Sequence, residues 1–235
     1  MKKYELTTNT KMCFGHQLFQ IRALKDFGNV KAGELGGYIE KEENLLHSGD
    51  AWISENALVY GNAKVFGNAK IFGNAQVCGD AWICDNVKVY DNAQIYDDAI
   101  VYGNARIFDN ARIFDNAKIC GDVKIYGDAL VYGNARVYEK VRVCGGACVS
   151  DNAMIYGKAC IFDNAKIYDN VQVYDNAMIY GKACIFDNVR VCNNVEAFGD
   201  VKICSDAKIC GDVKICGGRI CGDIPILETE KNNLF

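Results

Sequence analysis

The stretch that decides the fold reads NAKVFG at residues 62–67 and NAKIFG at residues 68–73. The same six-residue pattern returns as NARIFD at residues 104–109 and as DVKIYG at residues 122–127. It keeps one frame from residue 50 to residue 217, which amounts to 28 hexads without an insertion or a deletion. A period of six does not fit a helix face, on which apolar residues recur every three or four positions. It fits a short strand followed by a tight corner.

Each hexad has an inward side and a corner. The fourth position is Ile or Val in 27 of the 28 hexads, and the second is Ala or Val in all of them. Because side chains alternate along a strand, Val65 should point inward while Lys64 and Phe66 point outward. Gly67 and Asn68 should turn the chain, since both residue types tolerate a left-handed backbone. The sequence therefore predicts an all-β parallel β-helix with an aliphatic interior.

This pattern resembles the hexapeptide-repeat superfamily, in which an aliphatic residue is followed four places later by a small one. Ile71 with Ala75 and Val101 with Ala105 are examples, and the resemblance covers about 70% of the chain. It implies a triangular solenoid with three hexads in each coil, and hence about nine coils. It also implies a left-handed coil, an exception to the usual right-handed parallel crossover.

The two ends of the chain depart from the repeat. Residues 1–49 are predicted to form an N-terminal cap over the first coil, residues 50–217 the β-helix, and residues 218–235 a C-terminal cap and tail. Residues 26–38 (DFGNVKAGELGGY) resemble the opening segment of uncharacterised YdcK-like proteins of bacteria and their phages. The frame slips by one residue at Gly217–Gly218, after which residues 224–227 are expected to fold over the last coil and residues 228–235 to fray.

Asn or Asp opens 24 of the hexads, so these residues should stack in columns at the corners. Two interpretations stay open, a hydrogen-bonded ladder of amides and a simple turn preference. One such column, at eighteen-residue spacing, consists of Asn62, Asp80, Asp98, Asn116, Asn134, Asn152, Asn170, Asn188 and Asp206.

The thirteen cysteines are interpreted as structural filler. Eight of them share one hexad position, where other hexads carry Tyr or Phe, and no CxxC pair occurs. Metal ligation and disulfides are the less favoured interpretations, and no metal site is predicted. The eight are Cys78, Cys84, Cys120, Cys144, Cys192, Cys204, Cys210 and Cys216.

The chain opens without an apolar signal segment, and no stretch approaches the ~20 apolar residues of a membrane span. A reducing cytoplasm is therefore expected. The net charge of −4 at pH 7 gives no general reason to expect nucleic acid or an anionic membrane as a partner.

Catalytic residues are scarce. Many hexapeptide-repeat proteins are acyltransferases, and similar enzymes use a histidine base. The two histidines here, His16 and His47, both precede the first hexad. A base must lie within reach of the group that it deprotonates. An acyl-CoA-dependent acyltransferase would therefore have to work at the N-terminal cap, and no cofactor is predicted.

One outer face combines basic and aromatic residues at eighteen-residue spacing. Three interpretations stay open: stacking on single-stranded nucleic acid, shielding of the rings by the cationic side chains, and a protein-contacting surface. Acidic corners make nucleic acid the least favoured of the three. The column consists of Lys70, Phe72, Lys88, Tyr90, Arg106, Phe108, Lys124, Tyr126 and Arg142.

A second face carries less charge and is a candidate surface for self-association. Its strip consists of Leu58, Tyr60, Gln76, Gln94, Tyr96, Leu130, Tyr132, Cys148, Cys184 and Phe186. Residues 151–164 are repeated letter for letter at residues 175–188, four hexads later and so on the next face. Such interchangeable faces argue against one unique active site.

The sequence therefore favours a non-catalytic β-helical scaffold for binding or assembly, with a homo-oligomer, such as a trimer, or another protein as partner. The alternatives are the acyltransferase and a phage-encoded protein that sequesters a ligand or an immune effector.

Overall fold

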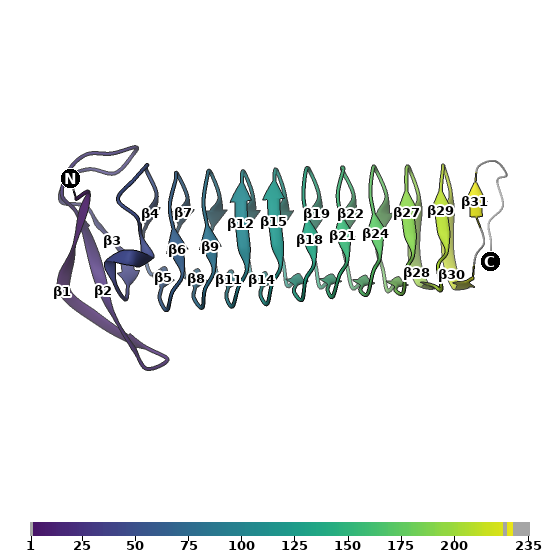
Figure 1. Ribbon diagram of the computed structural model, residues 1–235, viewed down its shortest axis with the longest axis horizontal. Helices are drawn as coiled ribbons and strands as arrows, with labels where there is room; N and C mark the ends of the chain where they lie inside the picture. The colour runs from purple at the N-terminus through teal and green to yellow at the C-terminus, as the bar shows by residue number, and fades with distance from the viewer. Residues whose placement is uncertain (1, 223–224, 228–235) are drawn as a thin grey trace. The chain divides into compact units, whose positions relative to one another are not determined.

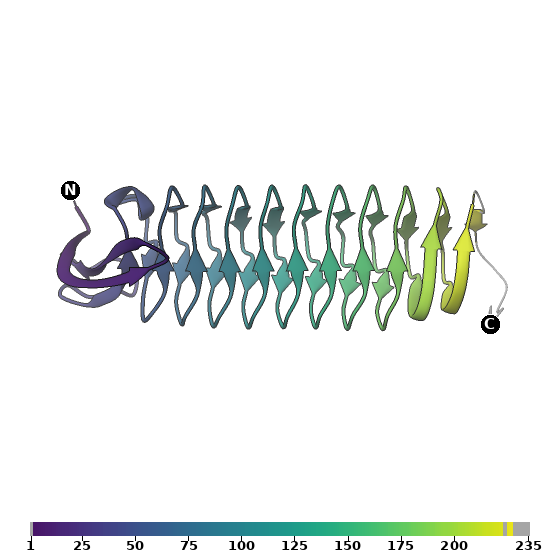
Figure 2. The ribbon, with the colours of Figure 1, turned by 90° about the horizontal axis from the view of Figure 1, so that it is seen from below.

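The computed structural model describes residues 2–222 and 225–227. The chain divides into two compact units, residues 1–115 and residues 116–235, and each is described by itself. The one helical element described is the 3-10 helix η1 (Glu42–Asn44), and the others are β-strands. Figures 1 and 2 show these strands as stacked rungs.

The first unit begins with three longer strands, β1 (Tyr4–Cys13), β2 (His16–Ala23) and β3 (Leu35–Ile39), in antiparallel order. Its repeat strands pair in parallel between positions eighteen residues apart, such as Lys70 with Lys88, so three hexads make one coil. The strands of its three faces are β4 (Trp52–Ile53), β7 (Lys70–Ile71), β10 (Lys88–Val89) and β13 (Arg106–Ile107); β5 (Leu58–Val59), β8 (Gln76–Val77), β11 (Gln94–Ile95) and β14 (Arg112–Ile113); and β6 (Lys64–Val65), β9 (Trp82–Ile83) and β12 (Ile100–Gly103).

The second unit repeats this parallel pairing, as between Lys124 and Arg142. The nine-residue strand β28 takes part in two of its faces. The strands of its three faces are β16 (Lys124–Ile125), β19 (Arg142–Val143), β22 (Cys160–Ile161), β25 (Met178–Ile179), β28 (Glu196–Cys204) and β30 (Lys214–Cys221); β17 (Leu130–Val131), β20 (Cys148–Val149), β23 (Lys166–Ile167) and β26 (Cys184–Ile185); and β15 (Lys118–Gly121), β18 (Arg136–Val137), β21 (Met154–Ile155), β24 (Gln172–Val173), β27 (Arg190–Cys192), β29 (Lys208–Cys210) and β31 (Pro225–Leu227).

The interior of both units is aliphatic, as the hexad predicts. Val65 and Ala69 in the first unit and Ile125 and Ala129 in the second have no exposed surface. Each buried Ile or Val contributes roughly 1.5–3 kcal/mol. The predicted parallel β-solenoid with an N-terminal region before the repeats is confirmed.

The corners are held by two kinds of side-chain hydrogen bond. Asn side chains form ladders between coils, as where Asn134 donates to Asn152 at 3.2 Å and Asn152 to Asn170 at 3.1 Å. This confirms the ladder for part of the predicted column. At its other end Asn62 accepts from Lys41 Nζ instead, and the aspartates that follow it have no amide to donate.

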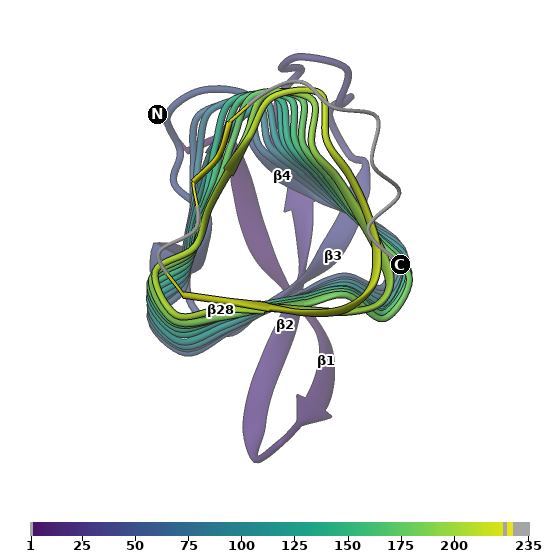
Figure 3. The same ribbon diagram turned by 90° about the vertical axis from the view of Figure 1, so that its right-hand side faces the viewer.

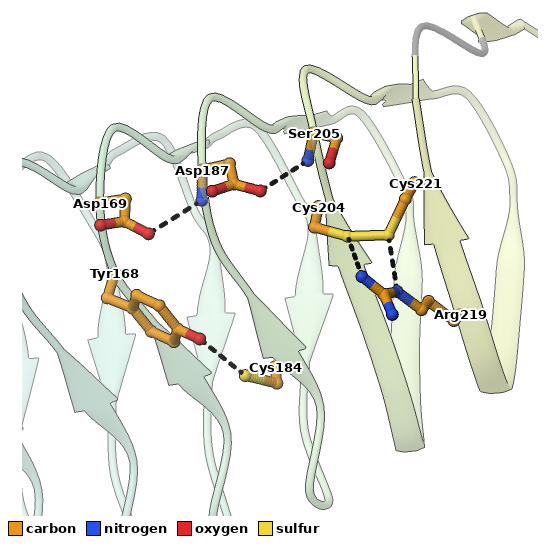
Figure 4. The surroundings of a disulfide bond; sticks show 8 residues. All are labelled: Tyr168, Asp169, Cys184, Asp187, Cys204, Ser205, Arg219 and Cys221. Carbon is orange, nitrogen blue, oxygen red and sulfur yellow. Dashed lines mark hydrogen bonds between the residues drawn. A yellow bond between two sulfur atoms is a disulfide. The ribbon is translucent and has the colours of Figure 1, made fainter.

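Corner aspartates cap the backbone of the next coil. Asp169 has a φ of 61°, and its Oδ2 accepts the backbone N–H of Asp187 at 3.1 Å. Asp187 accepts the N–H of Ser205 in the same way at 3.0 Å (Figure 4). Aspartate therefore alternates with glycine at these corners because it tolerates the left-handed backbone and also binds a free N–H.

The N-terminal cap satisfies the carbonyl groups of the first coil, which no earlier coil can reach. The N–H of Tyr38 donates to Ala57 O, Asn44 Nδ2 to Ala63 O, and Lys3 Nζ to Ala51 O, each at 2.9 Å. Lys3 is buried, and desolvation lowers its pKa to about 8. Strands β1 and β2 form a hairpin that extends beyond the coil (Figure 3).

At the C-terminal end the predicted frame slip is confirmed. β30 pairs with β28 at a spacing of eighteen residues up to Phe198 and seventeen from Val201 onward. The expected fold-over of residues 224–227 is wrong for its described part, because β31 adds to the edge of β29 as a further parallel strand. Residue 224 and the expected frayed tail, residues 228–235, lie outside the described residues.

Candidate functional site

His16 and Glu40 form a histidine–carboxylate pair where the tip of the β1–β2 hairpin meets the first coil. His16 Nδ1 lies 2.9 Å from Glu40 Oε1, and the backbone N–H of Gly61 donates to Glu40 Oε2 at 2.7 Å. The hydrogen bond from His16 is the main cause that holds the pKa of Glu40 below its usual value. The imidazole lies beside the Tyr60 ring, with centroids 5.1 Å apart. A carboxylate that holds Nδ1 leaves Nε2 as the nitrogen that can exchange a proton.

His47 sits in a different environment inside the cap. Its Nδ1 accepts the backbone N–H of Lys3 at 3.3 Å, and its ring lies 4.6 Å from that of Tyr4. Burial lowers the pKa of His47, although Glu42 lies 3.8 Å from Nε2. Because Nδ1 is an acceptor, Nε2 carries the proton of the neutral ring. The structure therefore separates the two predicted histidines and leaves only His16 with the arrangement of a base.

The basic residues of the predicted column lie on one face of each unit, but they differ in exposure and in hydrogen-bond partners. Lys70 Nζ donates to the carbonyl oxygen of Asp50 at 2.6 Å, and burial lowers its pKa. Lys70 therefore donates to a carbonyl group of the first coil, while its binding role stays a prediction. Lys88 and Arg106 lie exposed side by side on β10 and β13. In the second unit Lys124 lies beside the exposed Arg142.

The aromatic side chains of the column stack on one another. Phe72, Tyr90 and Phe108 form one stack, with centroids 4.8 and 4.9 Å apart and planes within 2°. In this stack the two faces of the Tyr90 ring are covered by the neighbouring rings. The described residues show one cation–π contact within the repeats, Lys64 over Trp82 at 5.2 Å. Tyr126 of the predicted column is half-buried, and a hydrogen bond with Cys144 raises its pKa.

The predicted apolar strip is partly covered. Leu58 and Tyr60 are 4% and 7% exposed, because they pack with Leu18 and Cys13 of the cap hairpin. Their assignment to an association surface is therefore wrong. Phe14, at the hairpin tip, is 82% exposed.

Four cysteines form disulfides, which corrects their interpretation as filler. Cys192 pairs with Cys210 and Cys204 pairs with Cys221, each with Cα atoms 4.7 Å apart. Figure 4 shows the second pair with the Arg219 guanidinium beside its sulfur atoms. The other predicted filler cysteines, Cys78, Cys84, Cys120, Cys144 and Cys216, are free thiols. For Cys192 and Cys210 the sequence signal is a separation of one coil between identical hexad positions. Cys204 and Cys221 are 17 residues apart, across the frame slip, and show no such signal.

The described part of the chain shows neither a metal cluster nor a membrane-spanning helix. No group of three or more His, Cys, Asp or Glu side chains there could hold a metal ion. No helix in residues 2–222 and 225–227 is long and apolar enough to cross a membrane. Location in the cytoplasm stays a prediction.

Comparison with known proteins identifies the repeats. The family model for the YdcK beta solenoid repeat matches residues 93–106, 123–139, 131–145 and 171–184. A curated Escherichia coli (strain K12) protein named "Uncharacterized acetyltransferase YdcK" is 37% identical over 71 residues. The match covers 26% of this chain and 22% of that protein, so only about a fifth of the relative is spanned. The predicted resemblance to YdcK-like repeat proteins is confirmed.

Proposed function

We propose that this YdcK-like β-solenoid is a non-catalytic binding scaffold whose basic column meets an acidic protein surface. The observation that carries the proposal is the exposed pair Lys88 and Arg106, which lie one above the other in neighbouring coils. Like charges directly opposite each other on a sheet destabilise it. An acidic partner would relieve that repulsion and would also steer association. Lys124 and Arg142 offer the same arrangement in the second unit.

A protein fits this column better than single-stranded nucleic acid does. Bases would have to stack on the faces of the rings, but the two faces of Tyr90 are occupied by Phe72 and Phe108. Inserting a base would require ring separations of about 6.8 Å, twice the 3.4 Å base repeat of DNA. The observed separations are 4.8 and 4.9 Å. Because the ring faces are covered, the stacked rings present only their edges to a partner beside the cations.

A second copy of the chain has suitable chemistry as the partner. Exposed aspartates such as Asp85 and Asp91 occupy corners of the same repeat. Pairing of a basic face with acidic corners would give a homo-oligomer, and head-to-tail contacts of this kind close into rings such as a trimer.

Sedimentation velocity of the wild type and of the double variant Lys88→Glu/Arg106→Glu tests the proposal. The wild type should associate at low salt and dissociate as salt screens the charges, and the double variant should be monomeric throughout. Arg112→Glu is the control, because Arg112 is exposed on β14 of a different face. Two results together would contradict the proposal. The wild type would stay monomeric at low salt, and it would capture the same proteins as the double variant does in a pull-down.

The His16–Glu40 pair supports a second candidate, acyl transfer from acyl-CoA. Nε2 would take the proton of an acceptor hydroxyl or amine while that group attacks the thioester carbonyl, and the CoA thiolate would leave and gain a proton. Glu40 would stabilise the imidazolium that forms. The name of the Escherichia coli relative points to the same reaction class, although the matched family segments lie within residues 93–184 and do not include the cap.

A thiol-release assay with acetyl-CoA and a panel of amine and hydroxyl acceptors tests this candidate. His16→Gln should abolish turnover, and Glu40→Gln should lower it and change its pH profile. His47→Gln is the control, because His47 lies elsewhere in the cap. Turnover that is equal in His16→Gln and the wild type would reject the candidate.

A further inference from the structure

One corner of the second unit is hollowed into a groove of about 620 Å³. Four successive coils line it, each with the two residues that turn its corner. These residues are Gly121 and Asp122, Glu139 and Lys140, Gly157 and Lys158, and Asp175 and Asn176. The groove therefore runs along the stack of coils rather than into the core.

Backbone N–H groups in this groove lack the aspartate cap that several other corners of the unit have. In the described part of the unit, the N–H groups of Asp151 and Asp163, which follow Gly133 and Gly145 by one coil, share this lack, so the lysines of this corner set it apart. Elsewhere in the unit a corner aspartate accepts the N–H of the next coil, as Asp163 does from Gly181 at 3.1 Å. The residues that precede Glu139 and Asp175 by one coil are Gly121 and Gly157, which have no side chain to offer. Among the described residues, the N–H groups of Glu139, Gly157 and Asp175 have no acceptor.

The glycines also leave these nitrogen atoms uncovered. A Cβ on Gly157 would lie 2.6 Å from the nitrogen of Asp175, and a Cβ on Gly121 would lie 2.9 Å from that of Glu139. Such distances are far inside van der Waals contact, so glycine keeps the space in front of the Glu139 and Asp175 nitrogen atoms open, whereas Gly157 follows Glu139 by one coil. Three donors thus follow one another at the coil spacing of roughly 4.8 Å.

Two lysines stand at the same corner where the repeat normally has Asn or Asp. Lys140 and Lys158 occupy the first hexad position in consecutive coils, and both are exposed. They replace the Asn side chains that form amide ladders elsewhere, so these two positions lack those side-chain hydrogen bonds between coils. In the described chain neither ammonium has a carboxylate within 4.0 Å. Two cations one coil apart repel each other unless an anion lies between them.

We propose that this groove binds an oxyanion of the phosphate class, with a diphosphate group as the best fit. Rows of backbone N–H groups with nearby lysines are the usual means of holding phosphate oxygens. One phosphoryl group bridges two neighbouring rungs, and a diphosphate spans the three rungs from Glu139 to Asp175. Lys140 and Lys158 neutralise its charge from the side.

The acidic side chains of the groove limit the affinity without blocking the donors. Asp175 Oδ2 accepts the N–H of Asn193 at 3.2 Å and is thereby held toward the following coil. Asp122 already takes part in an interaction within the protein. Glu139 is exposed and is the carboxylate that opposes an anion in the groove. Its removal should therefore strengthen binding.

Isothermal titration calorimetry at low ionic strength, with inorganic phosphate, inorganic diphosphate and ADP as separate probes, tests the site. Lys140→Asn and Lys158→Asn restore the residue that is usual at this position, and each should weaken diphosphate binding about tenfold. Glu139→Gln should tighten it. Lys182→Asn is the matched control, because Lys182 has the same hexad position beside a Gly181 N–H that Asp163 already caps.

The control variant should bind as the wild type does, and the affinity should fall as salt is added. Binding of ADP and inorganic diphosphate with equal affinity would support a free oxyanion as the ligand, and tighter binding of ADP would support a nucleotide. The proposal is overturned if no probe binds at millimolar concentration, or if Lys182→Asn weakens binding as much as Lys158→Asn does. Weaker binding by Glu139→Gln would also reject it.

Discussion

Reduction of the two disulfides should loosen the C-terminal coils of the second unit and leave its other coils unchanged. Cys192–Cys210 joins β27 to β29, and Cys204–Cys221 joins β28 to β30. In a solenoid each repeat is stabilised mainly by its immediate neighbours, so a coil near the end can open without the rest. The disulfides tie together the coils that have the fewest neighbours.

The expected magnitude follows from the lengths of the closed loops. The separations are 18 and 17 residues, for which the loop-entropy relation gives about 3 kcal/mol each at 25 °C. Because the two loops overlap in sequence, the combined effect should be less than the sum of both. An opening free energy lowered by about 3 kcal/mol corresponds to a loss of amide protection of about a hundredfold.

Hydrogen–deuterium exchange with and without a reductant measures this effect. Peptides that cover β27 to β30 should lose protection on reduction, while peptides that cover β16 to β19 should not. Cys216→Ser is the control, since Cys216 is an exposed free thiol in β30. Unchanged protection of β27 to β30, or an equal loss throughout the second unit, would refute the reasoning.

Three further perturbations test the fold. Burial raises the pKa of Tyr90 and of Tyr156 above the usual 10.0, so the folded chain holds more protons than the unfolded chain at alkaline pH. Its free energy of unfolding, measured by urea titration, should therefore be complete below pH 10 and should fall above it. A rise in stability above pH 10 would contradict this. Asn152→Ala removes bonds to Asn134 and Asn170 and should cost about 1 kcal/mol per bond in urea unfolding, whereas Lys182→Ala, at the same hexad position, should cost little. Lys3→Met leaves the buried Ala51 carbonyl without its donor, which should lower the free energy of unfolding by about 1–3 kcal/mol and speed amide exchange in the first coil. Equal exchange in the wild type and in Lys3→Met would argue against the role of the cap.

The coil interior could be predicted from the sequence because the inward positions are set by strand geometry. Val65 and Ile125 lie at the fourth hexad position, and that position is buried wherever a strand alternates its side chains. The part of the ladder around Asn152 was also within reach, since equal hexad positions eighteen residues apart stack directly. The candidate site was harder to predict. Nothing near His16 in the sequence indicates Glu40, because the hairpin and the coil edge meet only after folding.

The prediction was wrong for residues whose environment depends on the side chains of a neighbouring coil or of the cap. Cys192 and Cys210 look like isolated filler along the chain, yet stacking brings their Cα atoms to 4.7 Å. Lys70 looks like part of an exposed column, but it lies beside the first coil, whose carbonyl groups lack donors from an earlier coil, and its Nζ donates to Asp50 O. Leu58 and Tyr60 look like surface residues until the hairpin covers them.

The sequence by itself determined the parallel β-solenoid and the identity of its inward residues, because a strict six-residue period puts the Ile and Val of the fourth hexad position inside every coil. Only the tertiary structure decided which outward groups meet. The disulfides, the His16–Glu40 pair and the uncapped N–H groups beside Lys140 and Lys158 all join residues of different coils or of the cap. The physical reason is that burial depends on a residue's own position in the hexad, whereas these contacts depend on which side chain the neighbouring coil, or the cap, places beside it.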